Sequence, residues 1–356
     1  DKVEPTTYDV NQLGLKVDWD INETMTLHYV WGDMSGRDLV NQDFDGGDIN
    51  GGAIPFAQLH TLRDQSYSMT SNELRLDIEI NDALTAMVGF YDFGSELAFR
   101  QDTNNVLQLP TIALGLPFGT PCVIPGFRAN ATPGLESLCQ FPNARSTQLA
   151  GETVDSTAWF GSVTYRATDA FEVTLGARYI DESKEAFNSY FSYGDGTFDD
   201  TSGSGYNEHD FRAYAMTPGS AYQTPEKSWS DTIITASGSY RINDQSLAYI
   251  NYSEGFRSGG FSIRNASGAA TAGYDPESAD QIEVGIKNDL MNSRLRLNLA
   301  YYVLNRESAQ FSSIITLPPG SIPGTTTLIN NGGGSESKGW ELEGQWLIND
   351  NMRLIF

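Results

Sequence analysis

Short and long connections alternate along this chain, and the alternation limits the folds that it can adopt. Short polar breaks occur at residues 21–23, 81–82, 168–169, 243–244, 291–293 and 349–350. The connections between them are long, at residues 32–72, 95–152, 183–229, 257–279 and 309–335. Loops longer than about 15 residues are uncommon in compact domains. A sandwich or a propeller therefore does not explain a strict alternation of short and long connections.

The segments between these breaks alternate apolar and polar residues with a period of two. In residues 73–80, Leu74, Leu76, Ile78 and Ile80 alternate with four charged residues. Successive side chains of a β-strand point to opposite faces, so each such segment is predicted to be a strand with one apolar face. About twelve segments follow this rule and predict an all-β chain, among them residues 13–19, 25–31, 171–179, 295–303 and 340–346.

Strands with one apolar face, short turns at one rim and long loops at the other are typical of outer-membrane β-barrels. No apolar run reaches the roughly 18 residues of a membrane-spanning helix. The sequence therefore predicts a transmembrane antiparallel β-barrel with short periplasmic turns and long extracellular loops. The polar members of each strand are expected to line a hydrated inner wall with paired charges, among them Arg75, Glu79, Arg178, Arg294, Arg296, Glu341 and Glu343.

The charge of the chain excludes one class of partner. Acidic residues outnumber Lys and Arg by 46 to 22, for a formal net charge of −24. Such a surface repels phosphate, so nucleic acid is not an expected partner. The acidic loops are instead expected to meet lipid and lipopolysaccharide of the outer membrane through bridging divalent cations.

Few residues of this chain suggest catalysis or metal binding. Residues 43–48 (DFDGGD) resemble an acidic cation loop, but the Glu that closes a calcium-binding loop is missing. The three His are scattered, and no nucleophile–base motif is present. We expect no enzyme activity, no cofactor and no metal site. Cys122 and Cys139 lie in one polar stretch and are predicted to form a disulfide, the alternative being two free thiols.

Several motifs carry a family resemblance that covers the chain from about residue 8 to its end. Residues 247–261 (LAYINYSEGFRSGGF), 277–311 and 331–346 (NGGGSESKGWELEGQW) resemble, in order and spacing, the barrel of TonB-dependent outer-membrane receptors, particularly the iron-complex group. Residues 71–76 (SNELRL), 88–93 (VGFYDF) and 174–187 (TLGARYIDESKEAF) are similar to earlier strands of that barrel.

The resemblance implies more than a barrel. It implies uptake of a ferric siderophore or similar iron chelate, energised by the TonB–ExbB–ExbD system. Vitamin B12, haem or an oligosaccharide as ligand, a passive porin and an outer-membrane adhesin remain alternatives. Barrels of this family have roughly 22 strands. Residues 1–356 are therefore expected to form part of a barrel, without the plug domain and the closing C-terminal strands.

Two groups of residues are candidate contacts for a ligand. Exposed aromatic and His side chains in the long connection 188–229 are expected to contact an organic ligand, the alternative being that they pack the loop against itself: Tyr206, His209, Phe211, Tyr214, Tyr222 and Trp229. The glycines around Arg257 permit a sharp exit from a strand, and a structural role is sufficient for them. The alternative is that Arg257 points into the lumen and contacts the plug or an anionic ligand.

Overall fold

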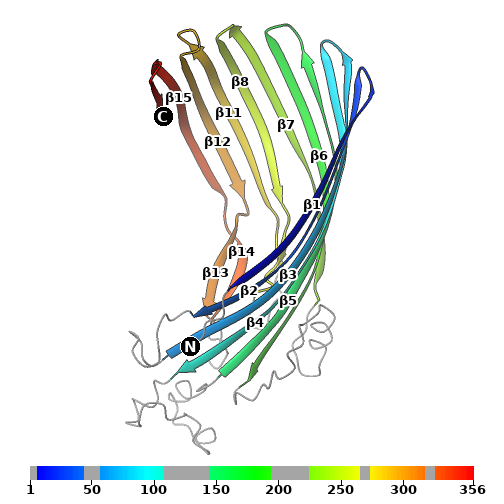
Figure 1. Cartoon of the computed structure of the whole chain (residues 1–356), viewed down its shortest axis with the longest axis vertical. Coiled ribbons are helices and arrows are strands. Elements are labelled where there is room, and N and C mark those ends of the chain that lie inside the picture. The colour runs from blue at the N-terminus through cyan, green and yellow to red at the C-terminus, as the bar shows by residue number, and fades with distance from the viewer. Residues whose placement is uncertain (1–5, 44–56, 108–143, 194–223, 265–272, 317–324) are drawn as a thin grey trace, which may run out of the picture.

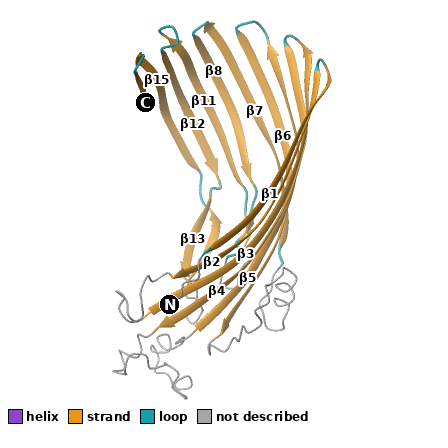
Figure 2. Ribbon diagram, in the orientation of Figure 1, coloured by secondary structure: helices purple, strands orange, loops and turns teal. Residues whose placement is uncertain are grey.

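A computed structural model describes residues 6–43, 57–107, 144–193, 224–264, 273–316 and 325–356. All regular structure in these ranges is β-strand, and the main sheet curves like part of a cylinder wall (Figure 1; Figure 2). The described part contains no helix that is long and apolar enough to cross a membrane.

Twelve strands form one antiparallel sheet in the order β1-β2-β3-β4-β5-β6-β7-β8-β11-β12-β15-β16. Each strand pairs with its neighbours along the chain, as in an up-and-down barrel wall. The strands are β1 (Thr7–Asn22), β2 (Met25–Asp43), β3 (Ala57–Asn81), β4 (Leu84–Leu107), β5 (Ala144–Arg166), β6 (Phe171–Tyr193), β7 (Glu226–Asn243), β8 (Ser246–Arg257), β11 (Glu277–Leu290), β12 (Leu295–Glu307), β15 (Ser335–Asn349) and β16 (Met352–Ile355). Two small hairpins lie outside the sheet, β9 (Gly260–Phe261) with β10 (Gly273–Tyr274) and β13 (Gln310–Thr316) with β14 (Thr325–Asn331).

The short turns confirm the predicted breaks, and most of them share one hydrogen-bonding pattern. In four of them an Asn side chain accepts a hydrogen bond from the backbone N–H two residues later, at 2.8–3.0 Å: Asn22, Asn81, Asn243 and Asn349. Such Asx turns reverse the chain without help from distant residues. The turn at Met291, Asn292 and Ser293 instead has three positive φ angles of 55°, 55° and 62°.

The strands extend much further than the sequence pattern predicts. β3 has 25 residues and β4 has 24, whereas a membrane-spanning strand needs only about 9–11. The predicted bounds of the long connections, such as 32–72 and 95–152, were therefore wrong, because much of each range is strand. Beyond the membrane both faces of the sheet meet water, so the period-two apolar pattern ends although the backbone pairing continues.

Register and exposure assign the two faces of the sheet. Leu15 is opposite Trp31 and Val17 is opposite Tyr29 on one face, and the Leu15 and Val17 side chains are exposed. The other face carries the polar residues that alternate with these apolar residues along each strand. In an outer-membrane barrel the apolar face points outward, so we assign the polar face to the inner wall.

Candidate functional site

Residues 258–264, which we term the strap, cross the inner wall after β8. The Ser258 hydroxyl donates to the Glu182 carboxylate on β6. The Gln148 side chain on β5 donates to the carbonyl of Ile263 at 3.0 Å, and Arg264 donates to the Gln65 side chain on β3 at 3.3 Å. The strap thus joins strands that are far apart in the sequence, at the rim of the long connections.

Apolar contacts hold the strap against the wall. Trp229, Phe261 and Ala186 form a buried cluster with exposures of 7%, 6% and 1%. The Trp229 and Phe261 rings lie 6.2 Å apart between centroids, a separation at which aromatic pairs attract. The guanidinium of Arg264 lies over the buried Phe99 ring, 5.1 Å from its centroid. The middle and the far end of the strap are therefore both packed.

Hydrogen bonds join the strap to the β13–β14 hairpin. The Gln310 amide donates to the carbonyls of Ser258 at 2.8 Å and Asp275 at 3.1 Å. The backbone N–H of Ile329 donates to the Ser262 hydroxyl at 3.0 Å. The Asn331 amide donates to the carbonyls of Asp275 and Ser308, both at 2.8 Å. Strap and hairpin therefore form one hydrogen-bonded unit over the inner wall.

Charged side chains lie beneath the strap. Glu182 accepts from Ser258 and pairs with Lys184 at 3.3 Å. Burial raises the pKa of Glu152 above its ordinary value of 4.5, Lys184 lowers it in part, and Glu182 adds to the rise. Burial likewise raises the pKa of the Tyr274 phenol. Lys184 therefore lies near the carboxylates of both Glu152 and Glu182, at a site that is partly shielded from water.

The raised pKa of Glu152 makes the stability of this region depend on pH. An acid whose folded-state pKa is raised favours the folded state below its unfolded pKa, and that contribution is lost as the pH rises through the folded pKa. We expect Glu152→Gln to raise the melting temperature at pH 8 and to change it little near pH 4.5. Glu23→Gln, at an exposed turn, controls for the loss of one negative charge. If Glu152→Gln raised the melting temperature equally at both pH values, the raised pKa of Glu152 would be contradicted.

Near the periplasmic turns, a chain of charges crosses the inner wall from β1 to β3. Lys16 pairs with Asp18 at 3.0 Å, and Asp18 lies 2.5 Å from Nδ1 of His28. The other ring nitrogen of His28 lies 3.2 Å from Asp77, which accepts from Arg75 at 3.3 Å. These contacts follow the wall and confirm the prediction of paired inner charges.

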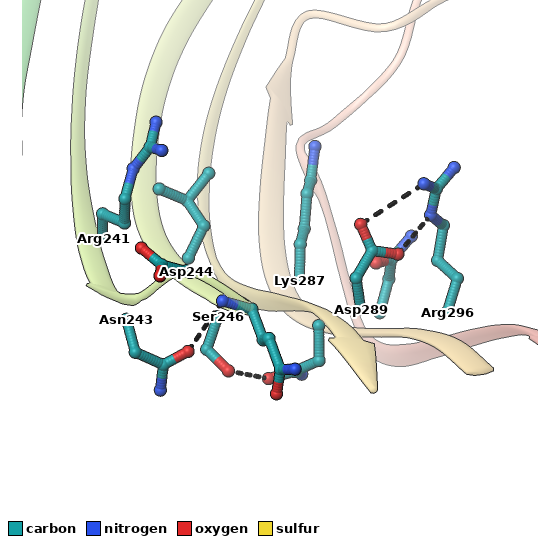
Figure 3. Close-up of a pocket in the computed structure, with 11 residues that line it drawn as sticks. Arg241, Asn243, Asp244, Ser246, Lys287, Asp289 and Arg296 are labelled. Atoms are coloured by element: carbon teal, nitrogen blue, oxygen red, sulfur yellow. Dashed lines mark hydrogen bonds and ion pairs between the residues drawn. The ribbon is translucent and has the colours of Figure 1, made fainter. Parts of the chain in front are cut away.

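A depression of about 420 Å³ lies between the periplasmic ends of β7, β8, β11 and β12 (Figure 3). Arg241, Lys287 and Arg296 line it together with Asp244 and Asp289. Arg296 donates to Asp289 at 2.8 Å and 3.3 Å, as the dashed lines show (Figure 3). The Lys287 amine lies 5.2 Å from the centre of the Tyr249 ring. The depression is lined mainly by polar and charged side chains and is open to solvent.

Most of the predicted inner-wall residues lie on the polar face. Arg75, Arg178, Arg296, Glu341 and Glu343 occupy inner positions in the register. Arg294 differs, because it donates to the carbonyls of Leu347 at 3.2 Å and Ile348 at 3.0 Å and so holds a turn.

The structure places two of the predicted ligand contacts. Trp229 is in β7, not in a loop, and it is buried under the strap, so the prediction that it is an exposed loop residue was wrong. Arg257 ends β8 opposite Glu277, and its side chain is exposed. Glu277 pairs with Arg306 at 3.2 Å instead. A plug or ligand contact by Arg257 stays a prediction.

The other candidates lie outside the described residues. These are the aromatic and His candidates Tyr206, His209, Phe211, Tyr214 and Tyr222, and the predicted disulfide of Cys122 and Cys139. Sequence reasoning missed Gln148 and Glu152, because their partners in the strap and on β6 are distant in the chain. The dense glycines of residues 255–260 were the available signal for a close approach of backbone to wall.

Sequence comparison decides the family. Residues 2–354 match the family described as TonB dependent receptor-like, beta-barrel. The chain belongs to this family. Members of this family are outer-membrane transporters rather than enzymes. The chain matches no curated protein sequence.

Solved structures of receptor barrels share the fold at low sequence identity. The ferric yersiniabactin uptake receptor FyuA from Yersinia pestis has a TM-score of 0.64 and 12% identity, over 97% of this chain and 40% of that one. The ferric-catecholate import receptor Fiu from E. coli K12, in its closed form, has a TM-score of 0.57 and 15% identity, over 98% and 46%. The siderophore receptor PiuA from Acinetobacter baumannii has the same TM-score and identity, over 97% and 45%. The chain thus spans less than half the length of these proteins.

Proposed function

We propose that this receptor barrel takes part in the energised uptake of a ferric siderophore or a similar iron chelate. The supporting observation is that the three solved structures described above, each with a TM-score above 0.5, are receptors named for ferric chelates or siderophores. The polar inner wall and the strap across its extracellular end are compatible with a gated path for a polar solute.

The proposal includes partners that act on the whole receptor. The TonB–ExbB–ExbD system would supply the energy through a plug domain, and residues 1–356 would form one part of the barrel wall. The outward apolar side chains, such as Leu13, Leu15 and Trp19, would contact outer-membrane lipid. Acidic residues at the rim would meet lipopolysaccharide through divalent cations.

Uptake of radioactive iron tests the function directly. We expect cells that lack this receptor to lose uptake of one ferric chelate from a panel of hydroxamate, catecholate and carboxylate chelates, and to regain it with the natural gene. Deletion of tonB should abolish the same uptake. Uptake that persists without TonB would indicate a passive porin, and an unchanged uptake of every iron chelate would contradict the proposed ligand class.

A further inference from the structure

Two aromatic rings flank one arginine on the inner wall. Gly89, Phe160 and Arg178 are directly opposite one another on β4, β5 and β6. A Cβ atom at Gly89 would lie 2.3 Å from Cζ of Phe160, so the ring occupies the space that this glycine leaves. The Cζ atom of Arg178 lies 5.3 Å from the centroid of the Phe160 ring and 5.3 Å from that of Tyr91. Both distances are typical of cation–π contacts.

The charge of Arg178 has no acidic partner among the described residues. Within the described structure, the Arg178 guanidinium contacts the Tyr91 and Phe160 rings. Arg75 pairs with Asp77 and Arg296 pairs with Asp289, whereas Arg241, like Arg178, has no ion pair among the described residues. Arg178 differs from Arg241 because two aromatic rings contact its guanidinium. Its free N–H groups are therefore available to a ligand.

A polar depression adjoins Arg178. Gly176 is the next inner position along β6, and it lies opposite Thr235 of β7. A depression of about 300 Å³ begins there, lined on the inner wall mainly by hydroxyl and amide side chains: Thr174, Thr235, Ser237, Asn251, Ser253 and Gln281, with the carboxylate of Glu283 at its far side. A cation flanked by rings thus stands beside a surface of mostly uncharged hydrogen-bonding side chains.

We propose that Arg178, Tyr91 and Phe160 form a binding subsite for a planar anion carried on an aromatic ring, such as an aryl carboxylate. The planar guanidinium presents paired N–H groups that match two oxygens of one anion. The rings hold the guanidinium in place and offer an aromatic surface to the ligand. This inference rests on the proposed function, because it names the chemistry of a chelate that the receptor would bind.

Binding of salicylate and its neutral analogue salicylamide tests the subsite. The receptor is purified from outer membranes, and the dissociation constants are measured by saturation-transfer NMR. We expect Arg178→Gln to weaken salicylate binding roughly tenfold or more, because hydrogen bonds to charged groups are lost. Salicylamide binding should change little. Arg178→Lys keeps the charge without the planar pair of donors and should give an intermediate loss.

Arg241→Gln is the matched control, because Arg241 is an inner-face arginine of β7 for which the structure shows no aromatic contact. Equal losses in Arg178→Gln and Arg241→Gln would overturn the subsite in favour of a general effect of lumen charge. Unchanged salicylate binding in Arg178→Gln, or no binding to the natural receptor, would also overturn it. Heat-modified mobility on gels checks that each barrel is folded.

Uptake assays separate this inference from the proposed function. If Arg178→Gln loses salicylate binding while the natural receptor imports no iron chelate, the subsite stands and the proposed function fails. If iron uptake depends on TonB while Arg178→Gln binds salicylate normally, the proposed function stands and the subsite fails.

Discussion

Gly259→Ala is expected to release the strap from the inner wall. A Cβ atom at Gly259 would lie 2.3 Å from the carbonyl oxygen of Tyr274 and 2.7 Å from the Trp229 ring. Neither group can move freely, because one is backbone and the other is a buried ring. Overpacking of this kind costs about 1–3 kcal/mol. The overlap lies beside the Trp229 and Phe261 rings, so the local cost falls on the cluster that packs the middle of the strap.

Hydrogen exchange measures this release. In Gly259→Ala, the amides of residues 258–264 should exchange at least about tenfold faster, which corresponds to about 1.4 kcal/mol of local opening free energy. Gly333→Ala is the control, because a Cβ at Gly333 would meet no atom within 4 Å. Equal exchange in the two variants would show that Gly259 is not a packing position.

Trp229→Ala should have the larger effect, because it removes the centre of the buried cluster with Phe261 and Ala186. Truncation of a buried Trp costs about 3–5 kcal/mol. We expect loss of protection throughout the strap and faster proteolysis at residues 258–264. The indole N–H makes no hydrogen bond in the described structure, so Trp229→Phe should retain most of the protection.

Trp340→Ala provides the control on the lipid-facing side, where the side chain is 71% exposed. It should leave strap protection unchanged. The Trp229 variants also decide between packing and ligand contact for this residue. If Trp229→Ala kept the strap protected but lost ligand binding, Trp229 would be a ligand contact and its packing role would be secondary.

Local sequence predicted the parts of the fold that depend on neighbouring residues. The turn at Asn22 is held by a bond within two residues, so its position could be predicted. The inner position of Arg178 also followed from alternation, because the period of a strand assigns each side chain to a face. The expectation of a paired charge did not hold for Arg178, because its guanidinium contacts two rings on other strands and forms no ion pair with a described residue.

Sequence reasoning failed where strands leave the membrane and where loops return to the wall. Residues 57–72 are β-strand although they look like a polar loop, because their partners are supplied by β2 and β4. In the sequence, Trp229 looks like an exposed aromatic residue of a loop. In the structure it is buried, because Phe261, more than 30 residues further along the chain, packs on it. Long-range contacts of this kind leave no periodic signal.

The amino-acid sequence was sufficient to predict an all-β membrane wall, its lipid-facing and inner faces, and the rim that carries the short turns. These features depend on a period of two and on turns that close within a few residues. The length of the strands outside the membrane, the path of the strap and the surroundings of Arg178 became visible only in the folded chain. Those features depend on side chains from separate strands, and which of them meet is set by the register of the sheet.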